Sequence, residues 1–126
     1  MQITAGELRS LFGPEAERGS SFIVRSAKDG SVRWISDAFL ELIGQTRAEF
    51  ERAAVDWDET TPPEYWMLDD WSIAQLGQSD IAAPYVKEIF RKDGSRIAVR
   101  VQVARRLTER TQLVELFTQL NEGPER

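Results

Sequence analysis

The most regular hydrophobic pattern in the chain lies in SRIAVRVQVA, at residues 95–104. Every second residue from Ile97 to Val103 is a branched aliphatic, whereas Arg96 and Arg100 fall on the opposite parity. Alternate side chains of a strand point to opposite faces of its sheet. The pattern therefore predicts a strand with one buried face and one polar face.

The run Lys-Asp-Gly-Ser occurs twice, at residues 28–31 and 92–95, each time between two strand-like segments. Asp-Gly at the centre of a two-residue loop supplies the positive φ angles of a type I′ turn. Both runs are therefore predicted to close hairpins, which pair SFIVRSA with SVRWIS and PYVKEIFR with the alternating strand. The first hairpin leads into a helix and the second into a further strand, TQLVELFTQL, so the two are not repeats of one unit.

Three Thr-x-x-Glu signals, which begin at Thr4, Thr46 and Thr61, precede segments with helical spacing. Each signal can satisfy two free amides at the start of a helix. After the third, Pro62 falls at the first helical position and Gly77 provides a C-terminal stop. A further short helix is predicted in SDAFLELIG, which has an apolar face and a closing glycine.

This order of elements predicts an α+β fold, in which an antiparallel sheet carries helices on one face. The last strand is apolar on both sides, and its second side must be covered by other apolar groups. The N-terminal amphipathic segment AGELRSLF or a partner subunit would cover it. We therefore expect a homodimer whose interface contains Leu8, Leu11, Phe12, Val114 and Leu116.

The composition of the chain excludes several classes of function. A chain of 126 residues suits one domain, and it contains neither cysteine nor histidine. Thiol nucleophiles, thiolate ligands and the commonest general base are therefore excluded. The net charge of −5 argues against nucleic acid as a partner. The sequence shows neither a signal-peptide pattern nor an apolar stretch long enough to span a membrane, so a cytoplasmic location is expected.

Three segments together, VRWISDAFLELIGQTRAEF, TPPEYWMLDDWSIAQL and PYVKEIFRKDGSRIAVRV, resemble the PAS sensory domains of bacterial sensor histidine kinases and cyclic-dinucleotide signalling proteins. The resemblance extends from about Ser20 to Leu120. It implies a five-stranded antiparallel sheet with helices over one face, often a small-molecule pocket, and signalling through dimerisation or a partner protein. It divides the chain into an N-terminal helix and linker (1–19), a PAS domain (20–121) and a C-terminal tail (122–126).

The sequence departs from the family pattern at two places. Ser36 stands where the family usually has asparagine, and serine can still cap the following helix. The last strand runs into NEGPER, not into the Asp-[Ile/Leu]-Thr-Glu link that often leads to an effector. This departure argues against coupling to a following domain, and the signalling partner or effector domain is expected not to be in this chain. A stand-alone adaptor and an excised input domain both stay open.

The resemblance also implies where a ligand would bind, between the sheet and the helices. The implied pocket residues are Trp34, Phe39, Phe50, Trp57, Tyr65, Trp66, Ile89, Val99, Val101 and Phe117. The same residue types fill ordinary protein cores, and composition does not separate a pocket from a core. Two hypotheses therefore stay open: a sensor that binds a small molecule, and a ligand-free module for protein interaction and dimerisation.

The absence of cysteine and histidine from the sequence argues against the cofactors that other members of the family bind. Flavin-adduct members of the family need a cysteine, and most haem-binding members use an axial histidine. We therefore expect neither cofactor, a protein without a visible absorbance band, and at most a small organic ligand that the sequence does not identify.

Clusters of charge are predicted to be solvated. Asp56, Asp58 and Glu59 lack the spacing and the glycine of a calcium loop, so no metal is expected there. Asp69 and Asp70 are expected on an exposed helical face. A solvated strand face, or the docking site of an acidic partner, is expected for the basic residues Arg91, Lys92, Arg96, Arg100, Arg105 and Arg106.

An enzyme is the remaining alternative. Small α+β barrels can act on apolar substrates with a buried carboxylate base, and Glu115, between Leu113 and Phe117, is the one candidate. A lone glutamate without histidine or tyrosine in a defined arrangement is weak support, so an edge or rim position is expected for it. We therefore predict no catalytic residues and no enzymatic activity.

Overall fold

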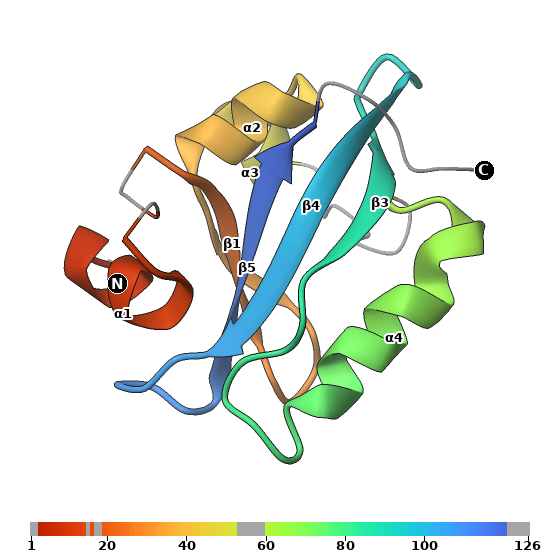
Figure 1. The fold of residues 1–126 in the computed structure, drawn as a ribbon. Helices are drawn as coiled ribbons and strands as arrows, with labels where there is room; N and C mark the ends of the chain where they lie inside the picture. Colours follow the sequence, from red (N-terminus) through yellow and green to blue (C-terminus); the bar gives the residue numbers. More distant parts are fainter. Residues whose placement is uncertain (1–2, 15, 17–18, 53–59, 121–126) are drawn as a thin grey trace.

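A five-stranded antiparallel sheet forms the centre of the protein, with helices on both of its faces (Figure 1). The computed structural model describes residues 3–14, 16, 19–52 and 60–120. The strands are β1 (Ser21–Ser26), β2 (Val32–Ile35), β3 (Tyr85–Phe90), β4 (Arg96–Arg105) and β5 (Gln112–Gln119). The helices are α1 (Ala5–Phe12), α2 (Asp37–Ile43), α3 (Arg47–Arg52) and α4 (Trp66–Gln75), and a 3₁₀ turn, η2 (Pro63–Tyr65), leads into α4.

The strand order is β2-β1-β5-β4-β3, which places the last strand at the centre of the sheet. β5 pairs antiparallel with β1 on one side and with β4 on the other. The predicted α+β class and the five-stranded antiparallel sheet are confirmed. In β4, Val99, Val101 and Val103 all point into one buried cluster, as their alternation predicts.

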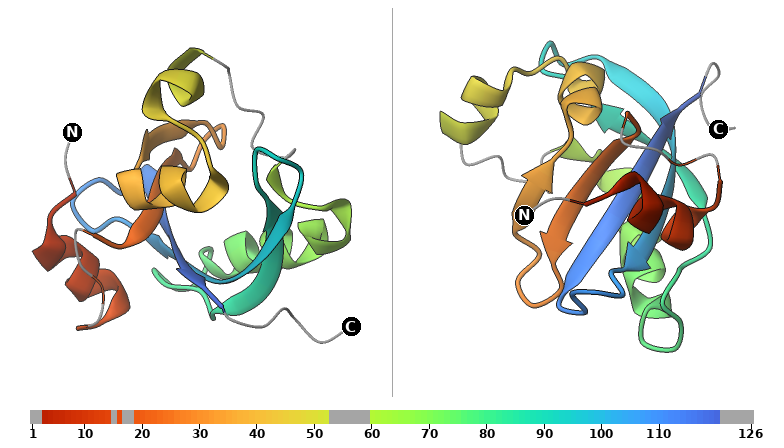
Figure 2. Two further views of the ribbon diagram at one scale, coloured as in Figure 1. Left: turned by 90° about the horizontal axis from the view of Figure 1, so that it is seen from above. Right: turned by 90° about the vertical axis from the view of Figure 1, so that its left-hand side faces the viewer.

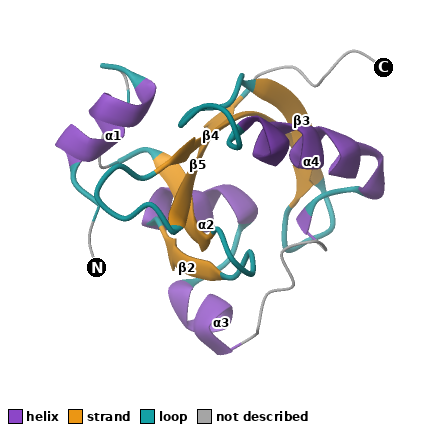
Figure 3. Ribbon diagram, turned by 90° about the horizontal axis from the view of Figure 1, so that it is seen from below, coloured by secondary structure: helices purple, strands orange, loops and turns teal. Residues whose placement is uncertain are grey.

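The two faces of the sheet have separate hydrophobic clusters. The inner cluster includes residues of α2 and Leu76 at the end of α4, and the outer cluster includes residues of α1. Figures 2 and 3 show α1 on the opposite side of the sheet from α4. Strand β5 is apolar on both sides and contributes to both clusters. Leu113 and Phe117 belong to the inner cluster, and Val114 belongs to the outer cluster. The chain therefore covers the second side of β5 with its own N-terminal helix.

α1 is held on the sheet by apolar contacts and by one buried ion pair. Leu8 is fully buried against the outer face. The Arg106 guanidinium donates two hydrogen bonds of 2.8 Å to the Glu7 carboxylate. Arg106 is only 5% exposed, so the prediction that it belongs to a solvated basic cluster is wrong. Burial of this arginine is possible because both carboxylate oxygens of Glu7 accept its N–H groups.

Both Asp-Gly runs do close hairpins, but the predicted turn type is wrong. A type I′ turn needs positive φ at two central residues. Among the described residues positive φ occurs only at glycine, including Gly30 (72°) and Gly94 (86°). In the second hairpin, Arg91 N–H donates to Ser95 O and Gly94 N–H donates to Arg91 O, which is the three-residue loop with a single left-handed glycine. In the first hairpin, Ser26 N–H donates to Ser31 O and Gly30 N–H donates to Ser26 O, which leaves four residues, 27–30, in the loop.

Two of the three predicted helix caps are present. The Thr4 hydroxyl accepts from Glu7 N–H at 3.0 Å. Thr46 and Glu49 form the reciprocal pair of a capping box, and a hydrogen bond from Lys92 together with the cap lowers the pKa of Glu49 to about 2. The third prediction is wrong, because the Thr61 hydroxyl accepts a hydrogen bond from the Lys87 ammonium instead.

Candidate functional site

The inner hydrophobic cluster contains half of the predicted pocket residues. Phe39, Ile89, Val99, Val101 and Phe117 are all buried in the inner cluster, and Phe50 packs against it. The rings of Phe39 and Phe117 lie 4.7 Å apart at an interplanar angle of 58°. These residues form the apolar wall between the sheet and the helices.

Three other predicted pocket residues lie elsewhere. Trp34 pairs with Val24 on the outer face, and it packs against the outer cluster. Trp66 is 47% exposed on α4, although its indole N–H donates to the Thr61 carbonyl. The Tyr65 hydroxyl donates to the Glu88 carboxylate.

The prediction that Trp34 and Trp66 line an inner pocket is therefore wrong. Strand parity places the first on the outer side of the sheet, and the orientation of α4 leaves the second half-exposed. The remaining candidate, Trp57, and the acidic residues Asp56, Asp58 and Glu59 lie outside the described residues.

A buried lysine is the most unusual feature of the inner side. The Lys87 side chain is 1% exposed, on the face of β3 that also carries Tyr85 and Ile89. Its ammonium donates to both carboxylate oxygens of Asp69, at 2.9 and 3.1 Å, and to the Thr61 hydroxyl at 3.0 Å. Asp69 is therefore turned toward the sheet, and the prediction that it lies on an exposed helical face is wrong.

Tyr85 completes this network. Its hydroxyl donates to Asp69 Oδ1 at 2.6 Å. Burial, followed by the charge of Asp69, raises the pKa of the Tyr85 phenol far above its usual range. The phenol therefore stays protonated and donates to the carboxylate at all physiological pH values. We name Thr61, Asp69, Tyr85 and Lys87 the α4–β3 network.

One hydroxyl beside this network has no partner. Ser72 follows Asp69 by three residues on α4, which places both on the same side of the helix. Ser72 is fully buried, and its Oγ forms no hydrogen bond with the described residues. A buried hydroxyl without a partner costs free energy, so such a group in a folded protein needs an explanation.

Glu115 lies inside the protein, in the central strand. Its side chain is 4% exposed and accepts a hydrogen bond from Arg25 at 3.1 Å. The expected edge or rim position is therefore wrong. The arginine neutralises the carboxylate in place, which makes burial of Glu115 possible.

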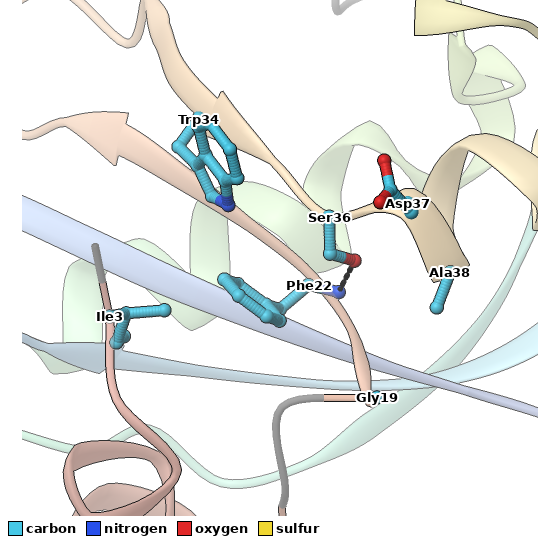
Figure 4. A pocket seen from close by; sticks show the side chains of 7 residues that line it. All are labelled: Ile3, Gly19, Phe22, Trp34, Ser36, Asp37 and Ala38. Atoms are coloured by element: carbon cyan, nitrogen blue, oxygen red, sulfur yellow. Dashed lines mark hydrogen bonds between the residues drawn. The ribbon is translucent and has the colours of Figure 1, made fainter. Parts of the chain in front are cut away.

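A hollow of about 420 Å³ opens on the outer side of the sheet (Figure 4). Figure 4 shows Ile3, Phe22 and Trp34 around it, close to the start of α2. Arg47 stacks over the Trp34 ring at 4.9 Å and donates to Asp37 at 2.7 Å. The polar groups at this hollow are thus already engaged with one another.

The five residues predicted for a dimer interface now divide into two groups. Leu8 and Leu11 of α1 and Val114 of β5 are buried together between α1 and the sheet within one chain. Phe12 and Leu116 are only partly buried, and both line a second outer hollow of about 450 Å³. Only these two have surface left to offer a second subunit.

Some site types are absent from the part of the chain that the structure describes. Residues 3–14, 16, 19–52 and 60–120 hold no group of three acidic residues that could bind a metal ion. None of the helices described there is both long and apolar enough to span a bilayer.

The sequence matches no protein-family model and no curated protein. Solved structures, however, resemble it over most of its length. The PAS domain of an HTR-like protein from Haloarcula marismortui is 20% identical, with a TM-score of 0.59 over 80% of this chain and 86% of that chain. The PAS domain of the fruit-fly ELK potassium channel is 13% identical, with a TM-score of 0.63 over 82% and 89%.

A LOV protein resembles the chain as well. The LOV protein of Rhodobacter sphaeroides is 10% identical, with a TM-score of 0.65 over 82% of this chain and 61% of that chain. The fold is that of a PAS domain. In this PAS fold, the α4–β3 network lies between the inner face of the sheet and α4.

Sequence reasoning missed the polar part of this PAS interior. Lys87, Tyr85 and Asp69 were not among the predicted site residues, and Asp69 was expected in solvent. One signal was present: the alternation in PYVKEIFR places Lys87 on the same face as Tyr85 and Ile89. The partner of the lysine, in contrast, depends on how α4 docks on the sheet.

Proposed function

We propose that this chain is the sensory module of a signalling protein, and that a small organic molecule binds between the inner face of the sheet and helices α2 and α4. Similarity of fold to PAS domains, among them one from a two-component sensor histidine kinase, supports the signalling role. The unpartnered, buried Ser72 hydroxyl beside the α4–β3 network is the observation that favours a ligand.

The inner side of the sheet has the character of a ligand site. Small-molecule sites combine apolar walls with a few placed polar groups. Phe39, Val101 and Phe117 supply the apolar wall, and Asp69 and Ser72 supply polar groups along one side of α4. A ligand that donates or accepts a hydrogen bond at Ser72 would satisfy its hydroxyl. Signalling then proceeds through a second subunit or a partner protein.

A second candidate function is a ligand-free interaction module. The contact between Phe39 and Phe117, and the complete burial of Val99 and Val101, favour an interior that is already filled. Such a core needs no ligand to be stable, because close packing alone supplies its dispersion and hydrophobic contacts.

Val101→Trp separates the two functions. Val101 lies between Tyr85 and Phe117 on the inner face, so a larger ring there enters any space for a ligand. With a pocket, we expect a nearly unchanged melting temperature and the loss of any thermal shift that a panel of metabolites gives with the wild type. With a filled core, overpacking lowers the free energy of unfolding by about 1 to 3 kcal/mol.

Val86→Trp is the matched control, because Val86 lies on the opposite face of β3 and is 36% exposed. It adds the same ring without filling the interior. Strong destabilisation by Val101→Trp alone, with no metabolite shift in the wild type, would rule out the ligand-binding function.

We propose neither catalysis nor a coloured cofactor for this chain. Glu115 is occupied by Arg25, and the sequence lacks cysteine and histidine. One of the similar structures is a light-oxygen-voltage domain studied with a flavin analogue. The proposal that this chain carries no coloured cofactor is tested by the absorbance of the purified protein between 350 and 700 nm. A Soret band or a flavin band would contradict it.

A further inference from the structure

The second outer hollow contains an arginine without a partner. Arg100 lies on the outer face of β4, because its neighbours Val99 and Val101 are buried in the inner cluster. It lines the hollow of about 450 Å³, is exposed, and forms no hydrogen bond or ion pair with the described residues. A hollow of this size lies within the range of about 300 to 1,000 Å³ that is usual for small-molecule sites.

The other arginines of β4 are engaged. Arg96 forms ion pairs with two glutamates, at 3.1 and 3.4 Å, and Arg105 donates to two backbone carbonyls, at 3.0 and 3.2 Å. On the adjacent strand β3, the carboxylate closest in register to Arg100 is that of Glu88. It already accepts hydrogen bonds from Arg96 and from the Tyr65 hydroxyl. The Arg100 guanidinium therefore remains available to an anion from outside the chain.

A second donor lies beside Arg100. Thr118 of β5 is its direct partner in the antiparallel register, so the two Cβ atoms are about 4.5 to 5.5 Å apart on the outer face. Thr118 lines the same hollow, and its hydroxyl forms no hydrogen bond within the part of the chain that the structure describes. A guanidinium and a hydroxyl next to each other suit the two oxygens of one carboxylate, and hydrogen bonds to an ionised acceptor are the stronger kind.

The rest of the hollow is apolar in part. Phe12 and Leu116 line it, and both are half-buried against the outer cluster. Apolar walls with a few placed polar groups are typical of sites for small organic molecules. The net charge of −5 opposes the approach of multiply charged anions, and a single guanidinium balances a single negative charge. This combination favours a monocarboxylate with an apolar tail over a phosphate.

We infer that the second outer hollow binds a small organic monocarboxylate. Its carboxylate accepts hydrogen bonds from Arg100 and Thr118, and its apolar tail packs on Phe12 and Leu116. A second subunit would cover the same two apolar residues, but the described residues that line the hollow offer no carboxylate to Arg100. The inference goes beyond the proposed function, whose ligand lies on the inner side of the sheet, and does not rest on it.

Two acids and their amides test the inference. The probes are phenylbutyrate and octanoate, one aromatic and one aliphatic, titrated into the full chain by calorimetry. We expect each acid to bind and its amide, which has the same shape without the charge, to bind at least about tenfold more weakly. The affinity of the acids should fall as salt is raised, because salt screens the attraction to the exposed guanidinium. Equal binding of acid and amide, or binding of neither acid, would overturn the inference.

Variants of the protein locate the site. Arg100→Gln should weaken the acids at least about tenfold and leave the amides nearly unchanged, since it removes a charge from an exposed position. Arg33→Gln is the matched control, because Arg33 is exposed in β2, which β1 and β5 separate from β4. It should bind the acids as the wild type does. Full binding of the acids by Arg100→Gln would overturn the inference.

Two other results would assign the hollow or the ligand differently. Binding of the acids that Val101→Trp abolishes and Arg100→Gln leaves intact would place them on the inner side of the sheet, which supports the sensor function and overturns this inference. Self-association of the wild type, together with no binding of either acid at any protein concentration, would assign the hollow to a second subunit and overturn it as well. A failure of the proposed function and a failure of this site are therefore separate results.

Discussion

At Lys87, an ammonium group lies almost wholly inside the protein, whereas its partner Asp69 keeps 31% of its side chain exposed. This asymmetry decides what each residue contributes to stability. Removal of one member of a buried ion pair is costly when the charge that remains cannot reach water. Asp69 can reach water without its partner, and it would keep the hydrogen bond from Tyr85. The Lys87 ammonium is too deeply buried to reach water in this way.

We therefore expect Asp69→Asn to destabilise the protein more than Lys87→Met. The first change leaves a buried ammonium without a carboxylate and should lower the free energy of unfolding by about 3 kcal/mol, whereas the second removes the buried charge and should cost about 1 kcal/mol or less. Urea titrations followed by circular dichroism measure both values. Equal losses, or a larger loss for Lys87→Met, would show that the network does not stabilise the protein in this way.

At the scale of elements, local signals predicted most of the structure. The caps at Thr4 and Thr46, and the hairpins at both Asp-Gly runs, depend on neighbouring residues only, and each formed where the sequence placed it. Thr61 failed as a cap because a tertiary partner, Lys87, took its hydroxyl. The sequence did not decide whether α1 or a partner covers the second side of β5, because the hydrophobic pattern alone does not say which apolar surfaces meet.

The contribution of α1 can be measured at one residue. Leu8 is fully buried in the outer cluster, so Leu8→Ala should leave a cavity and lower the free energy of unfolding by about 3 kcal/mol. Leu107→Ala removes the same atoms from an exposed loop position and should change it by less than about 0.5 kcal/mol. Chemical denaturation provides both numbers. A Leu8→Ala protein as stable as the control would mean that α1 does not stabilise the sheet.

At the scale of the whole molecule, the fold was easier to predict than the site. The resemblance to PAS domains rests on a long ordered series of short patterns, and the sheet of the structure agrees with it. Phe39, Val101 and Phe117 lie in the inner cluster, as their strand or helix parity predicts, and their role as the wall of a ligand pocket stays a prediction. Asp69 and Lys87 were missed because they are 18 residues apart and meet only when α4 docks on β3. The exposed face of α4 follows from the same docking, so local pattern gave no warning of it.

Association of two copies is the last property that belongs to this scale. Since α1 buries Leu8, Leu11 and Val114 within one chain, Phe12 and Leu116 are the predicted interface residues that remain for a contact on the outer face. We predict a homodimer through this remaining strip, and we expect Leu116→Arg to weaken association at least about tenfold while the domain stays folded, because a charge then enters an apolar contact. Val86→Arg, on the same face of the sheet but in β3, is the matched control and should dimerise normally. Sedimentation equilibrium of the three proteins measures the constants. A wild-type chain that stays monomeric at high concentration would leave α1 as a cover for its own sheet only, and the signal would then have to pass through another surface.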